Sequence, residues 1–140
     1  MRALLRVAAL LVAALPVVGC GVQPTEPIGG SPATGAVLYL VRDDTAVPVL
    51  RATGRPPTGA QALALLAGGP NAEEQAEGLS SRVPRTDVPI TLDGTTITVP
   101  ADVAALPDLA VTQIVCTSAS PGPVTLTGGG HRRGPLTCPL

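Results

Sequence analysis

Apolar and polar residues alternate most regularly in residues 88–99, on both sides of the pair Asp93-Gly94. Such alternation predicts half-buried β-strands, and an Asp-Gly pair between two of them indicates a two-residue hairpin turn of type I′. The turn implies a register with two apolar partner pairs, Ile90 with Ile97 and Val88 with Val99. Because all four side chains then lie on one face, the hydrophobic pattern and the turn predict the same hairpin.

Three further segments have the pattern of short strands. Residues 36–41 and 47–50 are apolar and flank a polar turn, so we expect them to pair with each other. Pro48 places the second of these strands at a sheet edge, because proline has no N–H to donate to a central ladder. Residues 124–127 alternate between aliphatic side chains and threonine and predict a last strand.

Capping signals predict a helix after Thr58 and a short helical turn after Asn71. Thr58 and Gln61 have the spacing of a capping box, and the apolar stripe that follows ends at Gly68-Gly69-Pro70. Asn71 and Glu74 form a second box. The acidic residues of this turn are interpreted as a solvated helical face near the positive end of the helix dipole: Glu73, Glu74 and Glu77.

Residues 108–117 carry apolar side chains at helical spacing, although their β-branched residues leave a strand open on local grounds. With a helix at this position, the predicted order of elements is β-β-α-β-β-α-β. This order predicts an α+β domain over residues 36–140, with a small antiparallel or mixed sheet and helices packed on one of its faces.

The composition restricts the core and the partners of this domain. Tyr39 is the only aromatic residue among 140, so the core must be built from small aliphatic side chains. All nine basic residues are arginines, and ten residues are acidic. With neither a basic stripe nor aromatic stacking platforms, the chain is not expected to bind nucleic acid.

Residues 1–19 have the pattern of a secretory signal, because two arginines precede an apolar stretch over residues 7–18. That stretch is shorter than the ~20 apolar residues needed to span a bilayer. It ends in Val17-Val18-Gly19-Cys20, which resembles the lipobox of bacterial lipoproteins. The resemblance implies cleavage before Cys20, a diacylglycerol thioether on its sulfur, and acylation of the new amine by a fatty acid such as palmitate. An ordinary cleaved signal with a chance cysteine, or a short membrane anchor, is the alternative.

Residues 20–35 are rich in Gly, Pro, Thr and Ser and show no apolar periodicity, which predicts a flexible tether behind the lipidated Cys20. A coil of about 15 residues spans roughly 20 Å, at about 5–6 Å × √n. Two or three acyl chains give durable attachment. We therefore expect a lipid-anchored protein on the extracytoplasmic face of the cell membrane.

Cysteines other than Cys20 are expected to form one pair, Cys116 with Cys138, joined by a disulfide in an oxidising compartment. A redox pair is the functional alternative, but the sequence has no C-x-x-C motif. A zinc site is not expected, because the paired ligand spacings are missing. No metal and no cofactor are therefore predicted.

Residues 128–134 are predicted to form a flexible exposed loop, since four of the seven are glycines. Arg132 and Arg133 are candidate anion contacts, with an anionic envelope polymer or a lipid head group as the ligand. His131, the only histidine, is interpreted as a solvated loop residue. Without a nucleophile signature such as G-x-S-x-G, the chain is not expected to be an enzyme.

Several motifs follow one another in a recognisable order: Leu65, Leu66, Gly69, Pro70, Glu74, Gly78, Leu79, Ser81, Val83 and Pro84, then Asp93, Gly94, Ile97, Val99 and the helix at residues 109–117. This order resembles the GerMN (sporulation and spore germination) domain of small actinobacterial lipoproteins. The resemblance covers residues 37–127. It implies helices packed on a three- or four-stranded sheet, which favours a helix at residues 108–117. The resemblance implies no catalytic residue in this chain, because the motif residues are turn glycines, prolines and core apolar residues.

Together these patterns predict a membrane-anchored envelope lipoprotein whose GerMN-like domain is a non-catalytic interaction or assembly module. Its expected partners are the membrane, through the lipid anchor, and an envelope protein or cell-wall component. A ligand-binding lipoprotein for a small molecule or cell-wall component is the alternative. An exposed apolar sheet face would favour the first function, and an apolar cavity would favour the second.

Overall fold

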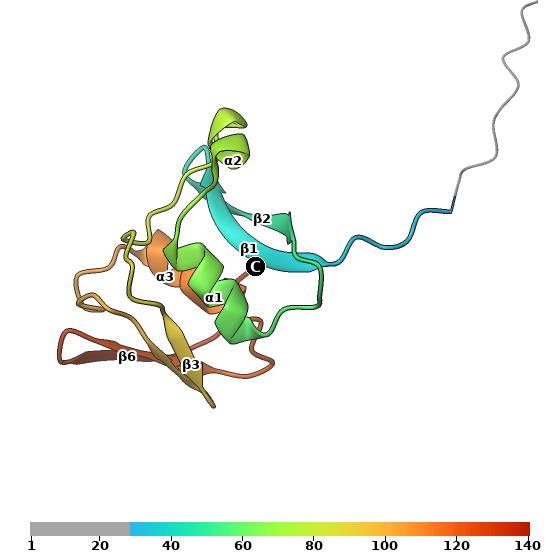
Figure 1. The fold of residues 1–140 in the computed structure, drawn as a ribbon. Helices are drawn as coiled ribbons and strands as arrows, with labels where there is room; N and C mark the ends of the chain where they lie inside the picture. Colours follow the sequence, from blue (N-terminus) through green and yellow to red (C-terminus); the bar gives the residue numbers. More distant parts are fainter. Residues whose placement is uncertain (1–28) are drawn as a thin grey trace, which may run out of the picture. The chain divides into compact units, whose positions relative to one another are not determined.

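The computed structural model describes residues 29–140; the signal, Cys20 and most of the tether lie outside them. The domain that follows is α+β, as the sequence predicts. Its elements are β1 (Gly35–Arg42), β2 (Thr45–Ala52), α1 (Gly59–Ala67), α2 (Ala72–Ala76), β3 (Thr91–Asp93), β4 (Thr96–Thr98), α3 (Asp108–Thr117), β5 (Val124–Gly128) and β6 (His131–Leu136) (Figure 1). The predicted order of elements is confirmed, with α2 and β6 in addition.

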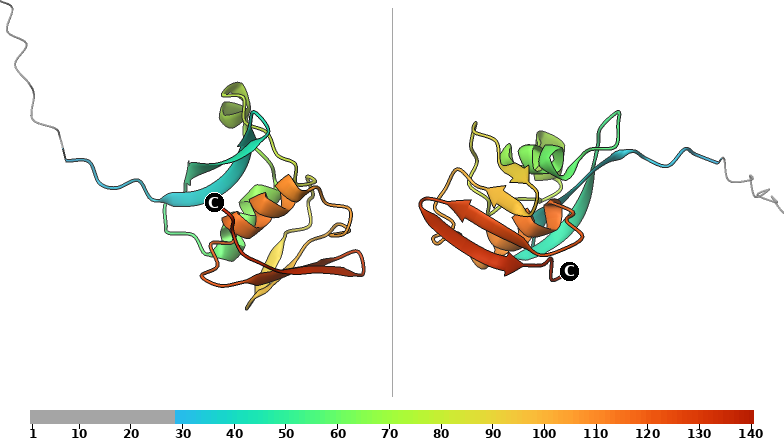
Figure 2. Two further views of the ribbon diagram at one scale, coloured as in Figure 1. Left: turned by 180° about the vertical axis from the view of Figure 1, so that it is seen from behind. Right: turned by 90° about the horizontal axis from the view of Figure 1, so that it is seen from below.

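The elements form three layers rather than one sheet with helices on it. Strands β1 and β2 make a two-stranded antiparallel sheet, and a four-stranded sheet has the order β3-β4-β5-β6. Helices α1 and α3 lie between the two sheets (Figure 1, Figure 2). Strands β4 and β5 run parallel, because α3 connects them as a crossover, so the larger sheet is mixed.

The core lies between these layers and consists of aliphatic side chains. Its largest fully buried members come from both sheets, from both long helices and from the residue directly before β3: Leu38, Leu40, Leu63, Leu66, Ile90, Ile97, Ile114 and Leu126. Gln113 of α3 is the one fully buried polar side chain among the largest, and it is hydrogen-bonded. Its amide nitrogen donates to the Tyr39 carbonyl at 2.7 Å, and its amide oxygen accepts from the Arg82 N–H at 2.8 Å.

The β3–β4 hairpin exists, but the predicted register is wrong by two residues. Ile97 pairs with Leu92 rather than with Ile90. Gly94, at φ +57°, is the first of two turn residues, as a type II′ turn requires, and not the second residue of a type I′ turn. A two-residue shift keeps every side chain on its face, so the hydrophobic pattern could not separate the two registers. Val88, expected on the buried face, is 59% exposed.

Replacing Gly94 with valine is expected to lower the free energy of unfolding by about 1–3 kcal/mol, because a β-branched residue is strained at positive φ. Nothing lies within 4 Å of a Cβ built at Gly94, so the cost comes from backbone strain alone. Chemical denaturation monitored by circular dichroism measures it. Thr95→Val, at the neighbouring turn position, is the control and should change stability little. Equal effects of the two changes would contradict this turn geometry.

The glycine-rich segment, predicted as a flexible loop, instead forms a hairpin. Strand β6 pairs antiparallel with β5, with Gly129 and Gly130 in the turn and a register shift between Val124 and Leu126. The sequence of β6 contains a glycine and a proline, which disfavour strands, and two arginines that interrupt any apolar alternation. An edge strand tolerates such residues because only one of its sides needs to pair.

Candidate interaction surface

One face of the β1–β2 sheet is turned away from the helices and carries apolar residues. In β1, alternate residues Ala36, Leu38 and Leu40 are fully buried in the core, so the residues between them point outward. The outward partner pairs are Gly35 with Ala52, Val37 with Leu50, Tyr39 with Pro48, and Val41 with Ala46. No charged side chain interrupts this set.

The larger apolar side chains that remain accessible to solvent on this face belong to four residues. Val37 is 47% exposed and Leu50 is 50% exposed, Pro48 is exposed, and Tyr39 is half-buried. Val41 and its partner Ala46, at the other end of this face, are buried. We call Val37, Tyr39, Pro48 and Leu50 the hairpin patch. It contains the only aromatic side chain of the protein.

Helix α3 fixes the backbone beneath the patch. The Tyr39 N–H donates to Thr117 Oγ1 at 3.0 Å, and the Tyr39 carbonyl accepts from Gln113 Nε2 at 2.7 Å. Both α3 side chains are buried, so these hydrogen bonds are shielded from water. They occupy the edge of β1 that does not face β2. The patch therefore lies on a rigid support.

The second edge of this sheet is interrupted by proline. Within residues 29–140 no strand pairs with the outer edge of β2. Pro48 removes one N–H from that edge, which confirms the edge position predicted for this strand. A partner strand could not form a continuous ladder there. The face of the sheet, rather than its edge, is the surface available for contact.

A buried ion pair holds the end of β2 against α2. Arg51 Nε lies 2.9 Å from Glu74 Oε1, and Arg51 Nη2 lies 2.5 Å from Glu74 Oε2. The same guanidinium donates to the carbonyl oxygens of Leu65 and Gly69. The Glu74 side chain is only 8% exposed. The interpretation of Glu74 as solvated is therefore wrong, whereas Glu73 and Glu77 are exposed.

The position of Arg51 in the sequence could have indicated this buried ion pair. Arg51 follows Val47 and Val49 at alternate positions of the inward face of β2, where a charged side chain needs a buried partner. Hydrogen bonds from Arg51, and a further one from the Asn71 N–H, hold the pKa of Glu74 below its ordinary value, although burial acts in the opposite direction. The charged pair is thus maintained at neutral pH.

The candidate anion contacts near the C-terminus do not converge on one point. Arg133 is half-buried and donates to the Leu106 carbonyl at 2.8 Å and to the carboxylate of Asp108, so its charge is compensated within the domain. Arg132 is exposed on β6. The ring of His131 forms a hydrogen bond of 2.8 Å between Nδ1 and Asp102 Oδ1. Two of the three side chains, Arg133 and His131, are thus hydrogen-bonded to neighbouring carboxylates.

Cys116 and Cys138 form a disulfide, with their Cα atoms 4.8 Å apart. Cys116 is buried on α3, and Cys138 is exposed in the segment after β6. The bond attaches this segment to α3, so β6 is held at its far end as well as by its pairing with β5.

Comparisons of the chain with protein-family models, with curated proteins and with solved structures found no match. No helix within residues 29–140 is long and apolar enough to cross a bilayer. In the same part of the chain, no three His, Cys, Asp or Glu side chains lie together in a way that could hold a metal ion.

Proposed function

We propose that the protein is a membrane-anchored envelope lipoprotein whose GerMN-like domain is a non-catalytic interaction module. The observation that carries the proposal is the hairpin patch, an apolar surface on a rigid sheet. Aromatic residues are enriched, and charged residues depleted, in the centres of protein interfaces. The lipobox-like sequence at Cys20 and the Gly/Pro-rich tether support the membrane anchor.

The proposed partner is another protein of the envelope with an apolar surface that covers the patch. The patch begins at Val37, directly after the tether enters β1. A flexible tether of about 15 residues has a root-mean-square span of roughly 20 Å, which sets the average distance between the domain and the bilayer. The partner therefore lies close to the membrane. Since Pro48 interrupts the edge of β2, the partner packs on the face of the hairpin instead of adding a strand.

The anchor is tested by Cys20→Ala. The variant is expected to leave the membrane fraction, because the acyl chains on Cys20 supply the attachment. Detergent-phase partitioning measures the loss, and the intact mass of the wild-type protein reports the acyl groups directly. Thr25→Ala, in the tether, is the control and should partition like the wild type. A mature N-terminus without acyl mass would exclude the lipoprotein assignment.

Leu50→Asp is expected to abolish association with the partner while leaving the domain folded, because Leu50 is already half exposed. A charge in the centre of an apolar interface loses its hydration without gaining a partner. Native electrophoresis of gently solubilised membranes should show the wild-type chain in a larger complex and the variant at the size of the free chain. Thr91→Asp, an exposed residue of β3, is the matched control. Persistence of the complex in the Leu50 variant would reject the patch as the binding surface.

A further inference from the structure

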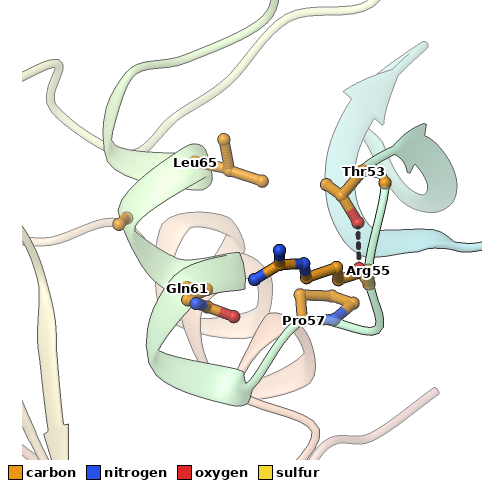
Figure 3. Close-up of a pocket in the computed structure, with 7 residues that line it drawn as sticks. Thr53, Arg55, Pro57, Gln61 and Leu65 are labelled. Atoms are coloured by element: carbon orange, nitrogen blue, oxygen red, sulfur yellow. Dashed lines mark hydrogen bonds between the residues drawn. The ribbon is translucent and has the colours of Figure 1, made fainter.

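A depression lies on the outer side of α1, between this helix and the connection from β2 (Figure 3). Its volume is about 610 Å³, within the range of about 300–1,000 Å³ that is usual for small-molecule sites. Six side chains line most of it: Thr53, Arg55, Pro57, Gln61, Ala64 and Leu65. None of these residues belongs to the hairpin patch.

The apolar part of the depression is aliphatic. Leu65 packs on the core with part of its side chain and leaves the rest exposed toward the depression, on the side that faces Thr53 and Arg55 (Figure 3). Ala64 and Pro57 extend this surface. No aromatic ring is present to stack on a sugar or a base. An alkyl chain is the ligand group that such a surface matches.

The guanidinium and the side-chain amide of the depression supply hydrogen-bond donors. The Arg55 side chain extends from the connection toward α1 (Figure 3), and none of the ion pairs within residues 29–140 includes it. The Gln61 amide oxygen accepts from the Thr58 N–H at 2.9 Å, which leaves the amide N–H groups for a ligand. Thr53 Oγ1 donates to the Arg55 carbonyl at 2.7 Å and steadies the connection. A guanidinium beside an amide donor favours a carboxylate or a phosphate.

We propose that this depression binds a single-chain anionic amphiphile. The alkyl chain lies on Leu65, Ala64 and Pro57, and the carboxylate or phosphate is held by Arg55 and Gln61. The Thr53 N–H donates to the Thr34 carbonyl at 3.1 Å, so the depression adjoins the point where the tether enters the domain. If the tether is anchored as proposed above, acyl chains with anionic head groups are available nearby; the binding chemistry itself does not depend on the anchor or on the hairpin patch.

The proposal is tested with the mature chain carrying Cys20→Ala, so that no attached acyl group competes. Decyl phosphate and decanoate, each below its critical micelle concentration, are titrated and followed by calorimetry and by amide NMR shifts. Both should shift the amides of residues 53–65. Decyl maltoside, with a neutral head, and inorganic phosphate, with no chain, should bind at least tenfold more weakly. Equal binding of the neutral detergent, or no binding at all, overturns the proposal.

Two variants locate the site. Arg55→Gln should weaken decyl phosphate at least tenfold, and Ala64→Glu should abolish its binding by placing a like charge in the depression. Arg132→Gln is the matched control, because Arg132 is an exposed arginine on β6. This variant should bind decyl phosphate as tightly as the protein with Arg132 does. Vesicles of anionic phospholipid distinguish lipids of the bilayer from free amphiphiles as the source of the ligand. If the vesicles compete with decyl phosphate, the ligand is a lipid of the bilayer. If they do not compete, the ligand is a free amphiphile. Equal weakening by the Arg55 and Arg132 variants overturns the proposal.

Discussion

Replacing Glu74 with alanine is expected to lower the free energy of unfolding by about 3–5 kcal/mol, the usual cost of removing one partner from a buried ion pair. The change leaves the Arg51 guanidinium, whose side chain is 17% exposed, without its carboxylate. It also removes the acceptor for the Asn71 N–H at the start of α2. Urea denaturation followed by circular dichroism measures the loss.

Glu73→Ala is the matched control, because Glu73 is the adjacent residue of α2, carries the same charge, and is exposed. Its effect should stay within about 0.5 kcal/mol, as for most surface substitutions. Similar losses for the two alanine variants would contradict the assignment of the buried pair as the source of stability.

The same pair should make the domain sensitive to acid. The pKa of folded Glu74 lies below its ordinary value of 4.5, first because of the hydrogen bonds from Arg51. The pair therefore contributes its full stability above the unfolded pKa and loses it as the pH falls through the lower, folded pKa. The free energy of unfolding should consequently fall more steeply below pH 4.5 in the wild type than in Glu74→Gln.

Removing the disulfide by the double change Cys116→Ala and Cys138→Ala is expected to cost about 3.4 kcal/mol, the chain-entropy value for a closed loop of this length. The two cysteines are 22 residues apart in sequence. The segment after β6 is exposed and has little apolar cover, so it should fray without the bond. Hydrogen exchange should then show faster exchange in β6 than in β4.

Reduction of the wild-type protein should produce the same loss of stability, while the double variant should not respond to reductant. This comparison separates the effect of the bond from that of the missing side chains. Alkylation of both cysteines in non-reduced, folded protein would contradict the disulfide.

The sequence predicted the elements of this fold better than their arrangement. The capping boxes at Thr58 and Asn71 are both present in the structure, because each depends only on residues three positions apart. The register of β3 and β4 was not predictable from the hydrophobic pattern, since a shift by two residues preserves both faces. Strand β6 was missed because its arginines, glycine and proline suit an edge strand but give no apolar alternation.

Helix α3 shows why local patterns were ambiguous. Nearly every residue from Ala110 to Ser118 is buried, because the helix lies between two sheets. A helix buried on most sides has no polar face, and its β-branched residues then read equally well as a strand. The resemblance to the GerMN domain favoured a helix, and residues 108–117 are helical in the structure.

The candidate sites were the part of the structure least predictable from the sequence, because tertiary packing forms them. The alternation in β1 and β2 could reveal two faces, but it could not show that no other part of residues 29–140 covers the face with Tyr39 and Leu50. Arg51 and Glu74 are 23 residues apart, and only the packing of α2 against β2 brings them together. The depression at Arg55 likewise requires the connection after β2 to fold back over α1.

Site-specific photo-crosslinking in living cells can show whether the hairpin patch is a binding surface. A photoreactive side chain replaces Val37, Leu50 or, as the control, Thr91 on the four-stranded sheet. We expect one discrete covalent product from positions 37 and 50, none from position 91, and loss of the product from position 37 when Leu50→Asp is added. Equal products from all three positions, or none from positions 37 and 50, would contradict it.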